Sequence, residues 1–227
     1  MPKVSVIIPV YGVEKYIERC ARSLFEQTLD DIEYLFIDDC TPDKSVEILK
    51  RVLEEYPQRK SQVVIHRMEQ NSGQAKVREW GMRNATGEYV IHCDSDDWVD
   101  VHMYEKMYKK SVSADYDIVV CDYYESDGIS HVRKNEYISD KVEETKSSIL
   151  LKKTHSVLWN KLVKKSIYNN KIIYPIANNA EDYALLVQLA YHSKSFGYVN
   201  EPLYFYFYNT SSLTKVMTNE NLINRFN

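Results

Sequence analysis

Short apolar runs alternate with stretches of helical period over the first half of the chain. The runs lie at 4–10, 33–38, 63–66, 88–93 and 117–121, and they are nearly continuous in apolar residues. Continuous apolar runs are typical of strands that are covered on both faces. Between the runs, apolar residues recur at helical spacing: Val13, Ile17, Ala21 and Leu24, then Val46, Leu49, Leu53 and Tyr56. The pattern predicts an α/β fold with a doubly wound, mostly parallel sheet flanked by helices.

The second half of the chain loses this rhythm. Residues 123–140 predict a long loop or a hairpin, and helical spacing returns at 143–153, 156–168 and 181–193. The aromatic stretch LYFYFY follows at 203–208, and a further helix could begin within 219–227, so a C-terminal segment could be missing from this sequence. Because no repeat and no Pro/Gly-rich linker separates the halves, we expect one domain over residues 1–227.

The composition is that of a folded protein, with 44% hydrophobic and 27% charged residues. No apolar run approaches the ~18 residues of a membrane span, and the first residues do not read as a signal peptide. The four cysteines lack CxxC spacing, which favours reduced and mostly buried thiols. These features predict a cytoplasmic protein.

Charge is distributed unevenly, although the net charge is only −4. No acidic residue lies between Glu144 and Glu181, a stretch that carries seven lysines. Such a basic band predicts a local anionic partner, either a diphosphate or a membrane surface, and not nucleic acid. Solvated lysines along helix faces are the alternative. The band comprises Lys146, Lys152, Lys153, Lys161, Lys164, Lys165 and Lys171.

Acidic residues follow several of the predicted strands, namely at Asp38-Asp39, at Asp94-Ser-Asp-Asp97 and at Asp122. Ligands of open parallel sheets bind outside these carboxyl ends. Neither GxGxxG after the first strand nor GxxxxGK[ST] occurs, so dinucleotide and P-loop sites are not supported. A divalent cation held by one or two carboxylates could instead neutralise a phosphate ligand. An acidic turn that only starts the helix near Asp100 is the alternative.

The order of several motifs resembles family 2 glycosyltransferases of GT-A fold, over nearly the whole chain. In the first half these are Pro9-Val-Tyr11, Ile37-Asp-Asp39, Asn71-Ser-Gly73 with Arg78 and Gly81, Gly87-Glu-Tyr89 and Asp94-Ser-Asp-Asp97. In the second half they are Trp159-Asn-Lys161-Leu and Glu181-Asp182. The resemblance implies a nucleotide-sugar-binding half at 1–100 and an acceptor-side half at 101–227.

The activity that the resemblance implies is metal-dependent transfer of a sugar, with inversion, from a nucleoside diphosphate-sugar to an acceptor hydroxyl. The donor would be a UDP-sugar, and the acceptor a saccharide or lipid-linked saccharide in surface polysaccharide or glycan synthesis. Asp96, together with Asp94, would hold Mn²⁺ or Mg²⁺. Asp94 and Ser95 would also contact the nucleotide-sugar. Peripheral contact with the inner face of the membrane is a further expectation.

The remaining roles also come from the resemblance. Asp39 would accept a hydrogen bond from the base, with Pro9 and Tyr11 walling the pocket, and Arg78 would reach the base or the diphosphate. An aspartate at a strand end is otherwise a turn former, and an exposed salt bridge is the alternative for Arg78.

On the acceptor side, Asp182 would be the general base. Glu181, Trp159 and Lys161 are weaker candidates for acceptor or phosphate contacts. The alternative for the Glu181-Asp182 pair is that acidic residues favour the start of a helix through its dipole. The alternative for Trp159 is a place in the core, since an aromatic residue on a helix is more often buried there.

Three departures from the family pattern qualify this interpretation. Gly12 and Glu79 stand where asparagines are common, and Phe207 stands where an arginine is frequent. Clamping of the diphosphate from the C-terminal side is therefore in question, and the lysine band could replace it.

Other functions remain open at this stage. A nucleotidyltransferase uses a related sheet but carries a glycine-rich basic loop after the first strand, where this chain has PVYGVEKY. A haloacid-dehalogenase-like phosphatase would place DxD after its first strand and not after about 90 residues. A module that binds a sugar nucleotide without catalysis is the third alternative.

Overall fold

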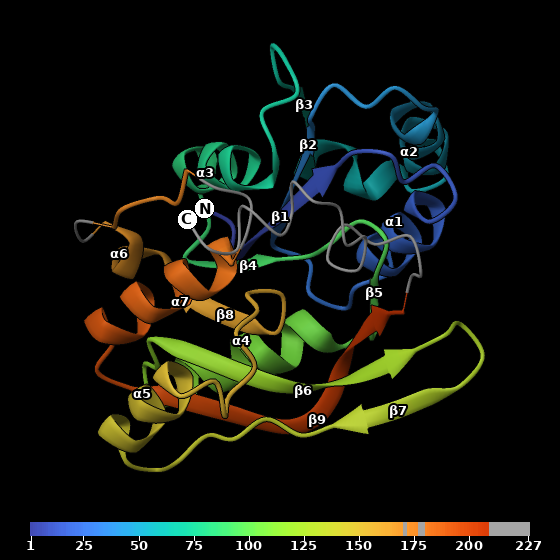
Figure 1. Cartoon of the computed structure of the whole chain (residues 1–227). Coiled ribbons are helices and arrows are strands. Elements are labelled where there is room, and N and C mark those ends of the chain that lie inside the picture. The colour runs from blue at the N-terminus through green and yellow to red at the C-terminus, as the bar shows by residue number, and fades with distance from the viewer. Residues whose placement is uncertain (170–171, 177–179, 209–227) are drawn as a thin grey trace.

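The computed structural model describes residues 1–169, 172–176 and 180–208 (Figure 1). Its strands form one sheet in the order β3-β2-β1-β4-β8-β6-β9-β5, and β7 pairs with β6. The strands are β1 (Val4–Val10), β2 (Ile32–Asp38), β3 (Val63–Arg67), β4 (Tyr89–His92), β5 (Trp98–Val99), β6 (Ile118–Ser126), β7 (His131–Lys134), β8 (Lys161–Lys164) and β9 (Phe196–Phe207). The helices are α1 (Ile17–Phe25), α2 (Ser45–Glu54), the 3₁₀ helix η1 (Pro57–Gln62), α3 (Gln74–Asn84), α4 (Met103–Ser113), α5 (Val142–Leu150), α6 (Lys165–Tyr168) and α7 (Glu181–His192).

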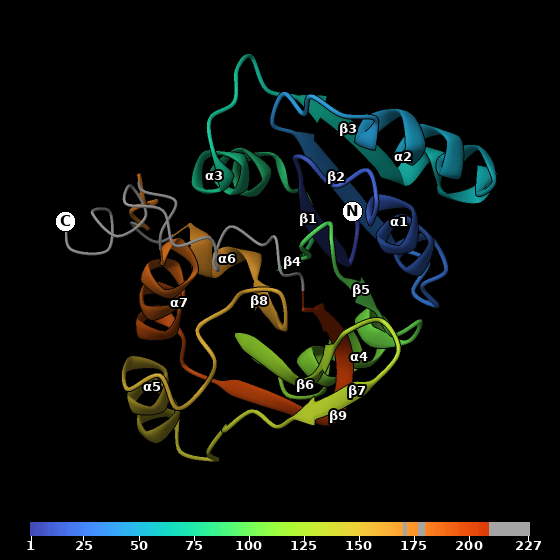
Figure 2. The ribbon, with the colours of Figure 1, turned by 45° about the vertical axis from the view of Figure 1, so that its right-hand side comes forward.

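Helices cover both faces of the sheet (Figures 1 and 2). On β1, Val6 and Ile8 belong to the core under α1, α2 and α4, whereas Ile7 belongs to the core under α3, α5, α6 and α7. Because successive side chains of a strand point to opposite faces, a continuous apolar run is what a doubly covered strand needs. The predicted fold class is confirmed.

The first four strands in chain order pair in parallel, β3-β2-β1-β4. The second half continues the same sheet, because β8 lies antiparallel between β4 and β6, and β9 runs parallel to β6. The segment predicted as loop or hairpin contains the turn of the β6–β7 hairpin. All five strands expected in the first half are present, together with the helices between them.

The helix expected at 156–168 is wrong. Residues Lys161–Lys164 form β8, and only the single turn α6 follows. Val163 of β8 pairs with Val90 on one side and Ile118 on the other, so tertiary pairing in the middle of the sheet overrides the local helical pattern. Residues 203–207 of LYFYFY form the end of β9, and Tyr208 follows the strand. The helix considered for 219–227 lies outside the described residues. No helix in the described ranges is both long and apolar enough to cross a membrane.

Candidate functional site

Helix α3 lies unusually close to the sheet, and this closeness sets the position of Arg78. A Cβ added to Gly81 would come 2.6 Å from Cγ2 of Ile7 and 3.0 Å from Cδ1 of Ile37, so only glycine permits this approach. The helix begins after Gly73, whose φ of 81° also favours glycine. Arg78, one turn before Gly81, is therefore held against the carboxyl end of β4.

Arg78 joins two carboxylates that lie far apart in the sequence. Its Nη2 donates to Oδ1 of Asp94 at 2.8 Å, and its Nη1 donates to Oδ1 of Asp182. The arginine side chain is 4% exposed, against 24% for Asp94 and 17% for Asp182. Burial acts to lower the pKa of Arg78, but the charges of Asp182 and Asp94 outweigh it, and the pKa is raised. The exposed salt bridge considered for Arg78 is thus a buried one that connects β4 to α7.

The Asp94–Asp97 turn carries the remaining acidic residues. The backbone N–H of Asp97 donates to the carbonyl of Asp94 at 3.1 Å, which closes the turn. Asp97 is fully buried, and its carboxylate accepts from the Tyr204 hydroxyl at 2.6 Å and the Phe207 N–H at 2.7 Å. Asp97 is therefore an internal anchor. The helix-starting role fits Asp100, whose Oδ1 accepts from the N–H of His102 just before α4.

Four carboxyl groups of this region hold protons more tightly than usual. Burial, and then the charges of Asp96 and Asp94, raise the pKa of Asp97 well above its ordinary value. Burial, and then the charge of Asp94, raise the pKa of Asp96 to about 6. Burial, and then the charge of Asp182, raise the pKa of Glu181 to about 7. Burial also raises the pKa of Asp182, opposed by Arg78. The site therefore concentrates negative charge that nearby arginines, Arg78 at Asp182 and Arg19 at Asp96, offset only in part.

Asp182 lies in the first turn of α7, as its sequence position suggested. Its second oxygen, Oδ2, accepts from the backbone N–H of Leu158 at 3.4 Å. The helix dipole and the contact with Arg78 both favour the ionised form, whereas burial opposes it. A carboxylate so placed can accept a proton when a substrate hydroxyl reaches it.

The residues predicted to bind the nucleotide lie near the ends of β1 and β2. Both oxygens of Asp39 accept backbone hydrogen bonds, from Ser72 at 2.7 Å and Gly73 at 2.8 Å, which fixes the loop before α3. Tyr11 is 48% exposed, and Pro9 is half-buried. Ser95, within the acidic turn, is buried.

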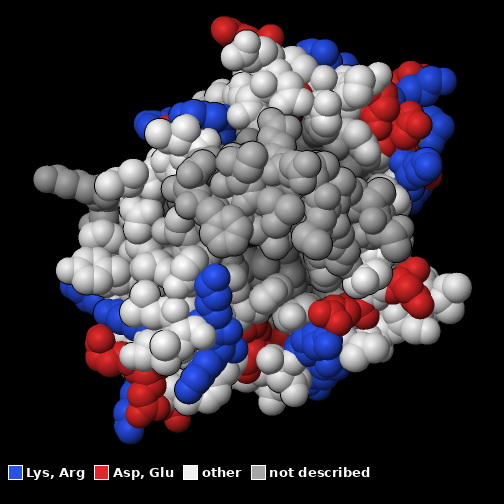
Figure 3. All heavy atoms as spheres, viewed as in Figure 1, with Lys and Arg blue, Asp and Glu red and all other residues white. Residues whose placement is uncertain are grey.

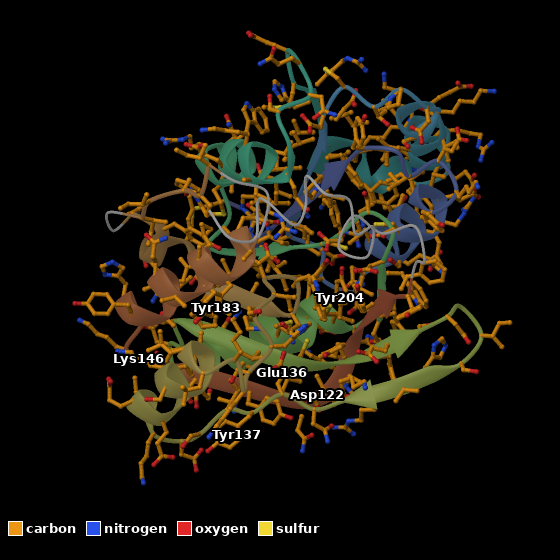
Figure 4. All side chains as sticks on the ribbon, in the orientation of Figure 1. Asp122, Glu136, Tyr137, Lys146, Tyr183 and Tyr204 are labelled. Carbon is orange, nitrogen blue, oxygen red and sulfur yellow. The ribbon has the colours of Figure 1, made fainter. Side chains whose placement is uncertain are left out.

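Trp159 and Lys161 lie inside the protein. The Trp159 ring is 2% exposed and stacks on Tyr204 with ring centroids 4.2 Å apart. Nζ of Lys161 donates to Oδ1 of Asn160 at 2.7 Å and lies 3.6 Å from Oε1 of Glu136. Figure 4 labels Glu136 and Asp122 in the lower half of the molecule, below Tyr204. A direct contact of either residue with acceptor or phosphate would require these packed arrangements to change.

The lysine band does not form a uniform basic surface among the described residues. Lys161 is buried, Lys146 pairs with Glu143 on α5, and Lys164 pairs with Asp115. Lys171 lies outside the described residues. On the face shown in Figure 3, basic side chains lie beside acidic ones.

Phe207, which replaces the frequent arginine of the family, lies under a different arginine. The guanidinium carbon of Arg19 is 4.6 Å from the ring centroid of Phe207 and 3.6 Å from that of Trp98. Nη2 of Arg19 also donates to the backbone carbonyl of Asp96 at 2.9 Å. A cation from α1 therefore lies beside the acidic turn, and the sequence pattern did not indicate it.

Sequence reasoning also missed Tyr204 and His92. Tyr204 stands in an aromatic run that marks a strand but does not single out one hydroxyl. His92 is fully buried at the end of β4, and neither of its ring nitrogens has a hydrogen-bond partner. Burial, and then the charge of Arg78, lower its pKa well below the ordinary value, so His92 is neutral.

Comparison with known proteins assigns the family. A model described as glycosyl transferase family 2 matches residues 5–191. The chain is 32% identical to glycosyltransferase GlyA of Streptococcus pneumoniae over 95% of its length and 32% of GlyA. It is 30% identical to the uncharacterized glycosyltransferase EpsJ of Bacillus subtilis over 95% of its length and 64% of EpsJ. The chain thus spans about one third to two thirds of these relatives.

A third relative is the minor teichoic acid biosynthesis protein GgaB of B. subtilis, 27% identical over 89% of this chain and 22% of GgaB. Among solved structures, TarS of S. aureus in complex with UDP-GlcNAc superposes with a TM-score of 0.81, at 19% identity over 95% of this chain and 61% of that one. Mannosyltransferase PcManGT of Pyrobaculum calidifontis, in complex with GDP-Man and Mn²⁺, has a TM-score of 0.68 at 16% identity over 93% and 58%. These two structures share the fold. By the match over residues 5–191, the chain belongs to glycosyl transferase family 2.

Proposed function

We propose that this chain transfers a sugar, with inversion and with the help of a divalent cation, from a UDP-sugar to a hydroxyl of a saccharide or lipid-linked saccharide in surface polysaccharide or glycan synthesis. The observation that carries the proposal is the convergence of Asp94 and Asp182 on the buried Arg78. It brings the acidic turn after β4 and the first turn of α7 to one point. Family membership supports this class over a nucleotidyltransferase or a phosphatase.

Asp182 is the proposed general base. As the acceptor oxygen attacks the anomeric carbon, Asp182 takes the hydroxyl proton, the new C–O bond forms, and the bond to the diphosphate breaks with its electron pair leaving on the nucleotide. The raised pKa of Asp182 makes it a stronger base than an exposed aspartate, and the contact with Arg78 favours its ionised form and orients it. General-base catalysis of this kind contributes roughly 10²–10⁴ in rate.

The acidic turn fits a divalent cation. The carboxylate of Asp96 is half-buried beside that of Asp94, and within the described residues no cationic side chain forms an ion pair with it. Hard carboxylate oxygens of this kind suit Mg²⁺ and Mn²⁺. Asp96, with Asp94, would hold the ion, which when bound supplies positive charge to the departing diphosphate. The Mn²⁺ complex of PcManGT supports this assignment.

The nucleotide would occupy the ends of β1 and β2. Asp39 is already oriented by the amides of Ser72 and Gly73, and each of its oxygens retains a lone pair for a base N–H. Tyr11 and Pro9 border the same strand ends. The UDP-GlcNAc complex of TarS supports a uridine nucleotide as the donor. Glycan acceptors are supported by GgaB, and membrane contact stays a prediction.

A thermal shift experiment tests the proposal. A panel of nucleoside diphosphate-sugars is added with Mn²⁺, with Mg²⁺ or with EDTA, and a UDP-sugar should raise the Tm only when a metal is present. Asp96→Asn should abolish the metal-dependent part of the shift. Asp100→Asn, which alters only the start of α4, should keep it. A panel in which no donor gives a metal-dependent shift would overturn the site.

A further inference from the structure

The acidic turn is held from β9 by hydrogen bonds to both of its ends. The Tyr204 hydroxyl donates to Oδ2 of Asp97 at 2.6 Å and accepts from the backbone N–H of Asp94 at 3.1 Å. The N–H of Phe207 donates to the other oxygen of Asp97 at 2.7 Å. One hydroxyl therefore bridges the first and last residues of the turn, across the hydrogen bond by which the turn closes itself.

These contacts are completely enclosed. Tyr204 and Asp97 are both 0% exposed, so water does not compete for the hydroxyl. The Tyr204 ring is fixed in turn, because Trp159 stacks on it with an angle of 13° between the rings, and because Tyr204 pairs with Val99 on β5 and Tyr123 on β6. Leaving a buried acceptor such as the Asp97 carboxyl without its donor is worth roughly a factor of ten to one hundred in an equilibrium constant.

We infer that Tyr204 is a positioning residue whose hydroxyl sets the spacing of the Asp94 and Asp96 carboxylates for the metal and the donor. The inference rests on the function proposed above for the acidic turn. Asp94 and Asp96 contribute the carboxylates that would bind the metal and the donor. The turn that carries them is held rigid by the hydrogen bonds at its two ends. Tyr204 makes the tie at Asp94 directly and the tie at Asp97 through its carboxylate.

The same geometry gives Trp159 a task. Its indole ring touches neither end of the turn in the described contacts, but it stacks on the residue that holds both. Trp159 of the Trp-Asn-Lys-Leu motif would then act on the donor site without touching it, because it fixes the ring of Tyr204.

The test compares two hydroxyl deletions on the same strand. Tyr204→Phe keeps the ring on Trp159 and removes only the hydroxyl. Tyr198→Phe is the matched control, because the Tyr198 hydroxyl donates at 2.7 Å to Asp122, which is also 0% exposed but belongs to a separate polar cluster. Binding of Mn²⁺ in the presence of UDP is followed by the loss of the free-ion electron paramagnetic resonance signal.

Tyr204→Phe should bind Mn²⁺ with UDP about tenfold more weakly, whereas Tyr198→Phe should match the parent. Hydrogen exchange without ligand gives a second readout: a peptide covering residues 90–100 should exchange faster in Tyr204→Phe alone, because the Asp94 amide loses its acceptor. Should Tyr204→Phe fail to fold, Trp159→Phe keeps the hydroxyl and should weaken Mn²⁺ binding by a smaller factor.

The possible outcomes distinguish a failure of the proposed function from a failure of the positioning role of Tyr204. A parent protein that binds no Mn²⁺ with UDP contradicts the proposed function itself. A parent that binds, with Tyr204→Phe indistinguishable from Tyr198→Phe in both affinity and exchange, overturns the positioning role alone. If Tyr204→Phe does not fold, unchanged Mn²⁺ affinity in Trp159→Phe would overturn it as well.

Discussion

Replacing Arg78 by methionine tests the bridge on which the candidate site is built. The variant keeps an unbranched apolar stem but lacks the guanidinium, so it leaves Asp94 and Asp182 without their common partner. Breaking a buried ion pair by removing one partner costs about 3–5 kcal/mol. Because the two carboxylates keep 24% and 17% exposure, we expect the lower end of that range, about 3 kcal/mol at pH 7.

A double-mutant cycle with Asp182→Asn shows whether this cost comes from the pairing. In the Arg78→Met background, Asp182→Asn removes one stranded charge and should recover about 1–2 kcal/mol, whereas in the parent it should destabilise. Urea denaturation of the four proteins measures the free energies of unfolding.

Arg59→Met is the control for the loss of a buried arginine. Arg59 is 6% exposed and donates to the carbonyls of Phe25 and Leu29 at 3.0 and 3.2 Å, far in the sequence from the acidic turn. Its effect should add to that of Asp182→Asn within about 0.5 kcal/mol. If Arg78→Met and Asp182→Asn are additive to the same degree, the reasoning on the bridge is refuted.

The other predictions concern catalysis, pH, base recognition and the membrane. Asp182→Asn should bind UDP with Mn²⁺ like the parent but transfer sugar roughly 10²–10⁴ times more slowly, so full transfer in a product assay would exclude it as the base. The pKa of Glu181 in the folded protein is raised from 4.5 to about 7, so its contribution to stability is present below about pH 4.5 and is lost as the pH rises to about 7. Glu181→Gln should therefore be more stable than the parent at pH 8 and equal to it at pH 4, which thermal melts at the two pH values measure. Asp39→Ala strands the amides of Ser72 and Gly73, so it should cost about 1–3 kcal/mol in urea denaturation and weaken discrimination of UDP from other nucleoside diphosphates in competition binding; undiminished discrimination would remove Asp39 from base recognition. Co-sedimentation with anionic liposomes should increase at low salt if the lysine band reaches a membrane, and indifference to anionic lipid would count against that contact.

The parts of the fold that depend on local sequence patterns could be predicted well. The strands at 4–10 and 88–93 are buried between two helical layers, and the need for two apolar faces is visible in their composition alone. The run at 63–66 is also a strand, but it forms the edge of the sheet and is only partly buried, with Val64 43% exposed. The segment 161–164 became a strand because of partners in β4 and β6, more than 40 residues distant, which no local spacing can indicate.

The candidate site was predictable as a set of residue types and less so as a set of contacts. Acidic residues at strand ends could be found because the fold places such ends together. The bridge from Arg78 to Asp182 spans 104 positions, and the tie from Tyr204 to Asp97 spans 107, so these pairings exist only once the sheet is assembled. Asp97 illustrates the limit: its carboxyl group anchors the turn to Tyr204 and Phe207, whereas the contact at the start of α4 belongs to Asp100, which follows β5.

The most direct test of the central claim is a crystal structure of the protein with UDP and Mn²⁺, with diffraction data collected at the manganese absorption edge. We expect one anomalous peak at coordination distance from the carboxylate of Asp96 and from the diphosphate, with Asp182 on the side from which the acceptor approaches. A manganese peak bound elsewhere, or UDP bound away from the ends of β1 and β2, would contradict it.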